Sequence, residues 1–317
     1  MKRLGICLLT FVLGAATAAV LPARGAEDTP PAKENVAHVV VTLHTTAAQP
    51  APVLSAEDIR VYENHHRLPV KTWVAAKAQS GPRDLTILMD DSVRANVSLQ
   101  FRDLAAFFST LPAGTRVRIA YAEYGGNKIV RNFTTDYPSA GKALRLPIGA
   151  SMAGGSIFDS VSDLVKKWPH DGNPRALLLV SDGIDLTQGL LDTEPPLNPE
   201  LQQAIDAAQK ADVTVYTIFA RGPLRLERDM FLMNNGQSCL LSLSTATGGQ
   251  SYFQGTRTPL AYAPYLRQFA RDLHNQYLLT FLTLPSAQSG YHRIRVTTEV
   301  PGVRLSAPAR VFVPKTT

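Results

Sequence analysis

The stretch from Asp84 to Val93 constrains the fold more than any other part of the chain. Its residues Leu85 to Met89 form an unbroken apolar run. Such a run is typical of a strand that is covered on both faces, because a half-exposed strand would alternate. The run ends abruptly in Asp90, Asp91 and Ser92. Open α/β sheets place their ligand sites at the carboxyl ends of such strands, so we expect a functional edge here.

Two further stretches are directed at the same edge. Gly154-Gly155-Ser156 opens a helical pattern, and the apolar run from Ala176 to Val180 ends in Ser181-Asp182-Gly183. Strand and helix patterns alternate through this middle part of the chain, which indicates α/β architecture. The expected strands are Val117–Tyr121, Lys128–Phe133, Ala176–Val180 and Val213–Phe219, and the expected helices are Leu99–Leu111, Ser156–Trp168, Pro199–Ala211 and Pro259–His274.

Taken in order, the three stretches resemble a von Willebrand factor A (VWA) domain. Such domains carry an Asp-x-Ser-x-Ser motif, a distant Thr and a distant Asp. In this chain the first motif is Asp90-Asp91-Ser92-Val93-Arg94, Ser156 stands where the Thr is expected, and Asp182 stands at the distant Asp. The resemblance covers roughly Asp84 to Asn275. With its flanks, the whole chain is similar to bacterial secreted "VWFA-related" proteins. The resemblance implies a Rossmann-like domain with a mostly parallel sheet, helices on both faces and one antiparallel edge strand.

The resemblance also implies a divalent cation site, with Asp90, Ser92, Ser156 and Asp182 as the metal ligands. Mg²⁺ prefers oxygen ligands of these kinds, and an open coordination position would accept a carboxylate from a partner protein. Arg94 departs from the motif, since a guanidinium is always charged and offers no lone pair. We therefore expect Mg²⁺ to bind weakly or not at all. The alternative is a hydrogen-bonded remnant of the metal site.

The expected function is that of a non-enzymatic, protein-binding module of the adhesion or scaffold type. A purely structural envelope protein is the alternative, and an enzyme that uses Asp90 and Asp182 is a third reading. A phosphotransferase of the haloacid-dehalogenase type needs a second Asp where this chain has Ser92. A phosphorelay receiver does not fit an exported protein. Neither enzyme class accounts for Ser156 and Asp182 together.

Both ends of the chain read as β-structure. Strands are expected at Val36–Leu43, Arg60–Glu63 and Leu68–Ala75, and again at Asn275–Leu284, His292–Val300 and Val303–Val313. Segments this short cannot bury much core alone. We therefore expect residues 36–80 and 276–317 to form one small β-sandwich, with the VWA domain, residues 81–275, inserted between them. Two separate β units are the alternative.

The first 26 residues have the composition of a secretory signal peptide, with basic residues followed by an apolar run and then small residues. Residues 27–35 read as a Pro-rich linker. We expect a secreted or periplasmic protein that contacts a membrane only if the leader is uncleaved. The formal net charge is +6, but the basic residues are scattered, so no nucleic-acid partner is expected. Cys239 would be alone in the mature chain, as a small buried residue.

Overall fold

The computed structural model describes residues 35–45, 52–76, 81–149, 155–169, 171–190, 193–222, 229–253, 261–284 and 289–315. All of these belong to one compact unit, Glu34–Thr317. The predicted signal peptide and all but the last residue of the predicted linker lie outside the described residues.

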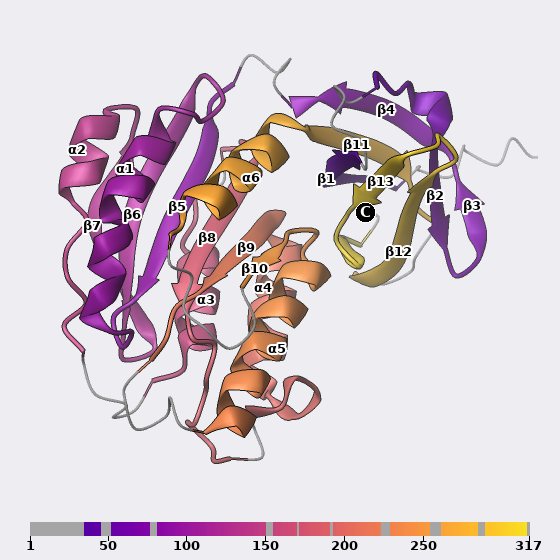
Figure 1. Cartoon of the computed structure of the whole chain (residues 1–317). Coiled ribbons are helices and arrows are strands. Elements are labelled where there is room, and N and C mark those ends of the chain that lie inside the picture. The colour runs from indigo at the N-terminus through magenta and orange to yellow at the C-terminus, as the bar shows by residue number, and fades with distance from the viewer. Residues whose placement is uncertain are drawn as a thin grey trace, which may run out of the picture. The chain divides into compact units, whose positions relative to one another are not determined.

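A six-stranded sheet forms the centre of this unit (Figure 1). Its strand order is β10-β9-β8-β5-β6-β7, and every neighbouring pair is parallel except β6 and β7. The antiparallel strand β7 lies at one edge, as expected for Lys128–Phe133. The strands are β5 (Arg83–Asp90), β6 (Thr115–Glu123), β7 (Gly126–Thr134), β8 (Arg175–Ser181), β9 (Val213–Phe219) and β10 (Ser251–Tyr252).

Helices cover both faces of this sheet. Helices α1 (Phe101–Phe108), α2 (Tyr137–Lys142) and α6 (Ala263–His274) pack on one face, and α3 (Ile157–Lys166), α4 (Pro199–Lys210) and α5 (Met230–Ala246) pack on the other. In β5, Leu85 and Ile87 face the first layer and Leu88 faces the second. All eight residues of β5 are buried, which explains why its apolar run does not alternate. The predicted VWA-type architecture is confirmed by this topology.

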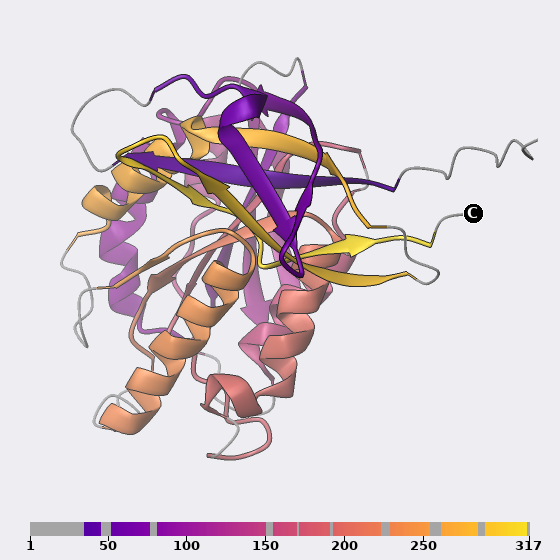
Figure 2. The same ribbon diagram turned by 90° about the vertical axis from the view of Figure 1, so that its right-hand side faces the viewer.

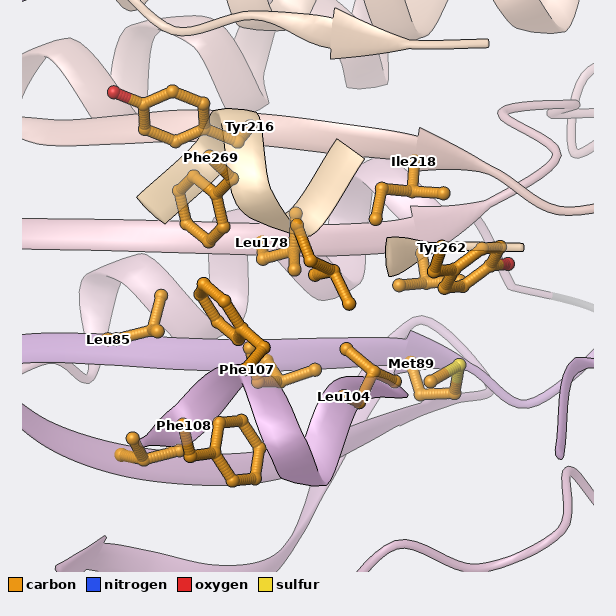
Figure 3. Packing of buried hydrophobic residues seen from close by; sticks show 14 of the residues in the cluster. Leu85, Met89, Leu104, Phe107, Phe108, Leu178, Tyr216, Ile218, Tyr262 and Phe269 are labelled. Carbon is orange, nitrogen blue, oxygen red and sulfur yellow. The ribbon is translucent and has the colours of Figure 1, made fainter. Parts of the chain in front are cut away.

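Aromatic and aliphatic side chains together fill the first layer (Figure 3). The Phe269 ring of α6 lies 5.3 Å from the ring of Phe107 in α1 and 4.6 Å from the ring of Tyr216 in β9, measured between centroids. All three side chains are almost completely buried. Phe269 therefore joins two helices to the sheet.

The two ends of the chain form two further four-stranded sheets, with strand orders β13-β1-β11-β4 and β14-β12-β2-β3 (Figure 2). Each sheet pairs strands from both ends: Val39 faces Leu279 in one, and Val61 faces Val296 in the other. Their apolar faces share one core. The predicted sandwich is confirmed, with strands β1 (Val36–Thr45), β2 (Ile59–Glu63), β3 (His66–Leu68), β4 (Val70–Ala75), β11 (Gln276–Leu282), β12 (Gly290–Thr298), β13 (Val303–Ser306) and β14 (Arg310–Val313).

Two predictions of single strands were wrong. The strands expected at Leu68–Ala75 and Val303–Val313 are each divided into two, and the halves belong to different sheets. Pro69 and Pro308 lie at the divisions. Because proline has no backbone N–H to donate to a ladder, each proline marks the place where the chain leaves one sheet for the other.

The helix predictions were incomplete in three places. The helix expected at Leu99–Leu111 is shorter, because Ala95–Gln100 forms a 3₁₀ helix ahead of α1. Helix α2, whose amino terminus is capped by the Asp136 side chain, was not predicted. Helix α5 was not predicted. It contains Asn234, Asn235 and Gly236, which have low helix propensity, and its apolar residues do not keep to one face.

Replacement of Phe269 tests this packing. Phe269→Ala should lower the free energy of unfolding by about 3–5 kcal/mol, because a cavity would remain among two helices and the sheet. Phe231→Ala is the matched control, since the side chain of Phe231 is 50% exposed, and it should change stability by about 0.5 kcal/mol or less. Urea unfolding of both variants measures the difference; equal losses would contradict the central position of Phe269.

Candidate binding site at the carboxyl edge of the central sheet

Asp90 is the last residue of β5 and lies buried among hydroxyl groups. Its Oδ1 accepts hydrogen bonds from the backbone N–H of Ser92 at 2.9 Å and from the Ser92 hydroxyl at 2.6 Å. Its Oδ2 accepts one from the Ser181 hydroxyl at 2.6 Å. Ser181 ends β8, the neighbouring parallel strand. The ends of β5 and β8 are therefore joined through this carboxylate.

Asp182 follows Ser181 directly and is enclosed by backbone. Its Oδ1 accepts the N–H of Ile184 at 2.9 Å. A Cβ added at Gly222 would fall 1.8 Å from its Oδ2, and a Cβ added at Gly236 would fall 2.3 Å from its carbonyl oxygen. A side chain at position 236 would therefore collide with backbone, and one at position 222 would displace the Asp182 carboxylate. Gly236 lies inside α5 in spite of its poor helix propensity, because the absence of a side chain lets the helix approach the Asp182 loop.

Ser156 caps the amino terminus of α3. Its hydroxyl oxygen accepts the N–H of Phe158 at 3.0 Å and donates to Asp185 Oδ2. Asp185 lies in the same loop as Asp182, and its Oδ1 accepts the N–H of Thr187 at 2.9 Å. Ser156 therefore reaches the Asp182 loop through Asp185. The sequence analysis missed Asp185. Its position three residues after Asp182 could have indicated that both carboxylates lie in the same loop.

Asp91 has a different environment from Asp90. It is fully buried and forms a two-bond ion pair with Arg145, at 2.8 and 2.7 Å. Arg145 also donates to Glu123 at 2.8 Å, and its guanidinium lies 3.9 Å from the centre of the Tyr121 ring. The backbone N–H of Ile148 donates to Asp91 at 3.0 Å. Asp91 thus holds the loop after Arg145 against the end of β5. No sequence pattern pointed to Arg145.

These neighbours separate the pKa values of the acidic groups. Burial raises the pKa of Asp182 to about 8, and the nearby charge of Asp90 adds to the rise. Burial also raises the pKa of Asp90, against the opposing effect of the Ser181 and Ser92 hydroxyls. Burial would raise the pKa of Asp91 too, but the hydrogen bonds from Arg145 and Ile148 outweigh it, and the pKa is lowered. Asp90 and Asp182 therefore form a buried pair of carboxyl groups that repel each other when both are charged.

A hard cation would suit this pair chemically. The candidate ligands Asp90, Ser92, Ser156 and Asp182 offer only oxygen, and a positive charge would relieve the repulsion between the carboxylates. Within the part of the chain that the structure describes, no three acidic, histidine or cysteine side chains converge closely enough to hold an ion by themselves. A cation would therefore depend on hydroxyl oxygens as well. Arg94 lies at the same edge, where its backbone N–H donates to Arg221 O at 3.0 Å.

Several segments at the carboxyl edge of the sheet carry exposed apolar side chains. Fifteen large apolar side chains are exposed among the described residues, and eight of them belong to segments at the carboxyl edge of the sheet. We call these eight the apolar rim: Leu99, Tyr124, Leu146, Ile148, Leu190, Leu197, Met230 and Phe231. Exposed apolar side chains concentrated at one edge of a domain are typical of an interaction surface.

Cys239 is buried elsewhere, in α5, as the sequence predicted. Its thiol donates to the carbonyl of Thr193 at 3.2 Å, and burial raises its pKa to about 12. A thiol in this state is a poor nucleophile. Within the described ranges, no helix combines the length and apolar character that crossing a bilayer requires.

No family model and no curated protein matches this chain. Among solved structures it is similar to the conserved hypothetical protein BatB from Bacteroides thetaiotaomicron, with 15% identity over 60% of this chain and 97% of that one (TM-score 0.43). It is also similar to an aerotolerance-related membrane protein from Bacteroides fragilis, with 13% identity over 60% and 98% of the two chains (TM-score 0.41). The VWA domain of SpRpn10 is similar at 11% identity over 61% and 97% (TM-score 0.39).

The raised pKa of Asp182 predicts that stability depends on pH. In the unfolded chain the carboxyl group loses its proton near its ordinary pKa of 3.8, whereas in the folded chain it keeps the proton until about pH 8. Its contribution to the free energy of unfolding is fully present below pH 4 and is lost as pH rises through 8. Asp182→Asn, which stays neutral, should flatten this decline in EDTA. Glu57→Gln, at an exposed position in the sandwich, is the control. Thermal unfolding from pH 4.5 to 8.5 tests it, and a decline of equal slope in parent and Asp182→Asn would contradict the assignment.

Proposed function

We propose that the chain is an exported, non-enzymatic protein-binding module, and that its carboxyl edge is the surface that binds the partner. The observation that carries this proposal is the apolar rim, whose exposed side chains lie in segments at the same edge of the sheet as the buried carboxylates of Asp90 and Asp182. Apolar anchors around a polar centre match the anatomy of protein interfaces, in which a few buried side chains supply most of the binding energy. The resemblance to VWA domains supports the same surface.

The polar centre is proposed to be a weakened Mg²⁺ site. Asp90, Ser92, Ser156 and Asp182 would hold the ion, which when bound supplies an attachment point for a carboxylate of the partner. The raised pKa values of Asp90 and Asp182 support this role, because they record a place where positive charge is favourable. Arg94 replaces a hydroxyl ligand of the motif, and its charge lowers the affinity for the ion. Export is proposed from the leader alone.

A binding experiment tests the surface. The parent protein is immobilised and exposed to the exported fraction of its source cells, beside a double variant of the apolar rim, Tyr124→Asp with Phe231→Asp. Asp is tolerated at both positions: Tyr124 has a left-handed backbone (φ 51°), which Asp adopts more readily than most residues, and Phe231 lies at the start of a helix. Val53→Asp, at a site 94% exposed in the sandwich segment, is the control.

We expect one specific partner to be retained by the parent and by Val53→Asp, and to be lost by the double variant. Asp182→Ala should weaken its retention as well. A partner held equally by all four proteins would place the binding surface elsewhere. Retention of no specific partner would favour the alternative of a purely structural envelope protein.

Arg94→Ser tests the metal site by restoring the full Asp-x-Ser-x-Ser pattern. A ligand that binds only the folded state stabilises by mass action, by about 2.7 kcal/mol when its concentration is a hundred times Kd. We expect millimolar Mg²⁺ to raise the unfolding temperature of Arg94→Ser clearly, relative to EDTA, and that of the parent slightly. Arg102→Ser, in the neighbouring helix α1, is the control for loss of a positive charge. An equal gain for parent and Arg94→Ser would show that Arg94 does not weaken the site.

A further inference from the structure

A groove of about 550 Å³ opens between the sandwich and the α/β domain. Its walls include His44 from β1, Arg304 and Ser306 from β13, Leu241 from α5, and Phe253, which follows β10. Its volume lies within the range of small-molecule sites. His44 contacts Asp272 in the last turn of α6. The next residue, Leu273, accepts a hydrogen bond from Arg83, the first residue of β5, so the groove lies toward the amino edge of the central sheet. It is therefore separate from the site of Asp90, the last residue of the same strand.

Three side chains at this groove lie in a row, and each contacts the next. The Nε2 atom of His44 lies 3.0 Å from the hydroxyl oxygen of Ser306. The Nδ1 atom of the same ring lies 3.4 Å from Oδ1 of Asp272. Asp272 is in turn fixed by Tyr252, whose hydroxyl donates to Oδ2 at 2.9 Å. With Nδ1 protonated toward the carboxylate, Nε2 is free to accept the proton of Ser306.

The fold explains how residues so distant in the chain meet. In the antiparallel pair β1 and β13, Thr42 faces Ser306 and His44 faces Arg304. His44 and Ser306 are therefore diagonal neighbours on one face of that sheet. Asp272 comes from the last turn of α6 and has a side chain only 6% exposed, compared with 16% for His44. A buried acid thus orients a partly exposed base next to a groove-lining hydroxyl.

We propose that Ser306, His44 and Asp272 form an acyl-transfer site that cleaves small carboxylic esters bearing a negative charge. The arrangement is the one by which a serine nucleophile is recognised: a base within hydrogen-bond reach of the hydroxyl, and a third group that orients the base. Ser306 and His44 are the catalytic residues, and Asp272 is a positioning residue. This inference goes beyond the proposed function and does not depend on it.

The reaction balances without a further reactant except water. The Ser306 oxygen bonds to the acyl carbon as its proton passes to His44 Nε2, and the ester C–O bond then breaks as that proton moves to the leaving oxygen. Water next attacks the acyl-serine and transfers a proton to His44, which returns one to Ser306. The products are a carboxylic acid and an alcohol.

The lining of the groove sets the class of ester. Its ionisable side chains among the described residues are His44 and Arg304, both basic. Arg304 stands two residues before Ser306 in β13, so both side chains point to the same face of the strand. Its exposed guanidinium is placed to bind an anionic group of the substrate. Leu241 and Phe253, which are 46% and 37% exposed, provide apolar contact.

Fluorophosphonate labelling of the full chain tests the nucleophile, because this reagent modifies activated serines. We expect one label per chain, located on Ser306 by peptide mapping. Ser306→Ala should abolish it, and His44→Gln should slow it about a hundredfold, the usual contribution of a general base. Ser251→Ala is the matched control: Ser251 lines the same groove, but its hydroxyl is paired with Thr217 at 2.7 Å rather than with a histidine. It should label like the parent.

Ester hydrolysis tests the other two roles. The mono-p-nitrophenyl ester of glutaric acid should be cleaved with a lower KM than p-nitrophenyl butyrate, and Arg304→Ala should remove this preference by raising KM for the charged ester. Asp272→Asn should lower kcat rather than raise KM, and Asp272→Glu should restore part of it. No labelling of the parent, labelling on another residue, or labelling at an unchanged rate in a folded His44→Gln protein would each overturn the proposal.

Discussion

The burial of strand β5 on both faces is the constraint on which the rest of the structure depends. Because helices cover both sides of the sheet, the strand has room for polar side chains mainly near its ends. Asp84 at one end pairs with Arg116, and Asp90 at the other end meets the hydroxyls of Ser92 and Ser181. The polar chemistry of this strand is thus concentrated at its two ends, and the carboxyl end meets the loops that follow β8.

Charge is distributed unequally at that edge. Asp91 receives a full counter-charge from Arg145, whereas the contacts of Asp90 and Asp182 described above are hydroxyls and backbone N–H groups. Adjacent residues in the sequence therefore have opposite pKa shifts. The ion pair between Asp91 and Arg145 stabilises the loop. The repulsion between negative charges at this edge therefore lies between Asp90 and Asp182. One part of the edge therefore holds the loop in place, and the other is the part that we propose for binding.

The sequence was informative wherever a property was local. An apolar run predicted β5 and β8, and their carboxyl ends predicted that Asp90 and Asp182 would lie close together, because parallel neighbours end at one edge. Arg145 could not be found in this way, since its ion pair joins residues 54 positions apart and no pattern records that distance. Helix α5 was missed because tertiary packing against the Asp182 loop, through Gly236, overrides its poor propensity. The sequence shows the two prolines that divide predicted strands, Pro69 and Pro308. That each marks a change of sheet could not be inferred without knowing that a second sheet is present.

The closure of the chain ends onto each other has a consequence at the opposite edge. When β1 and β13 pair, they bring residues 44 and 306 together, and the α/β domain between them supplies residue 272 at the end of α6, its last helix. The junction between sandwich and α/β domain must bury polar side chains from both, and those side chains need partners. Thr42 and Tyr216 satisfy each other at 3.2 Å in its interior. His44, by contrast, is only partly covered and borders an open groove. The same hydrogen-bonding requirement thus produces a closed structural contact at Thr42. Two residues further along β1, at His44, it produces a base and a hydroxyl that a small molecule can reach.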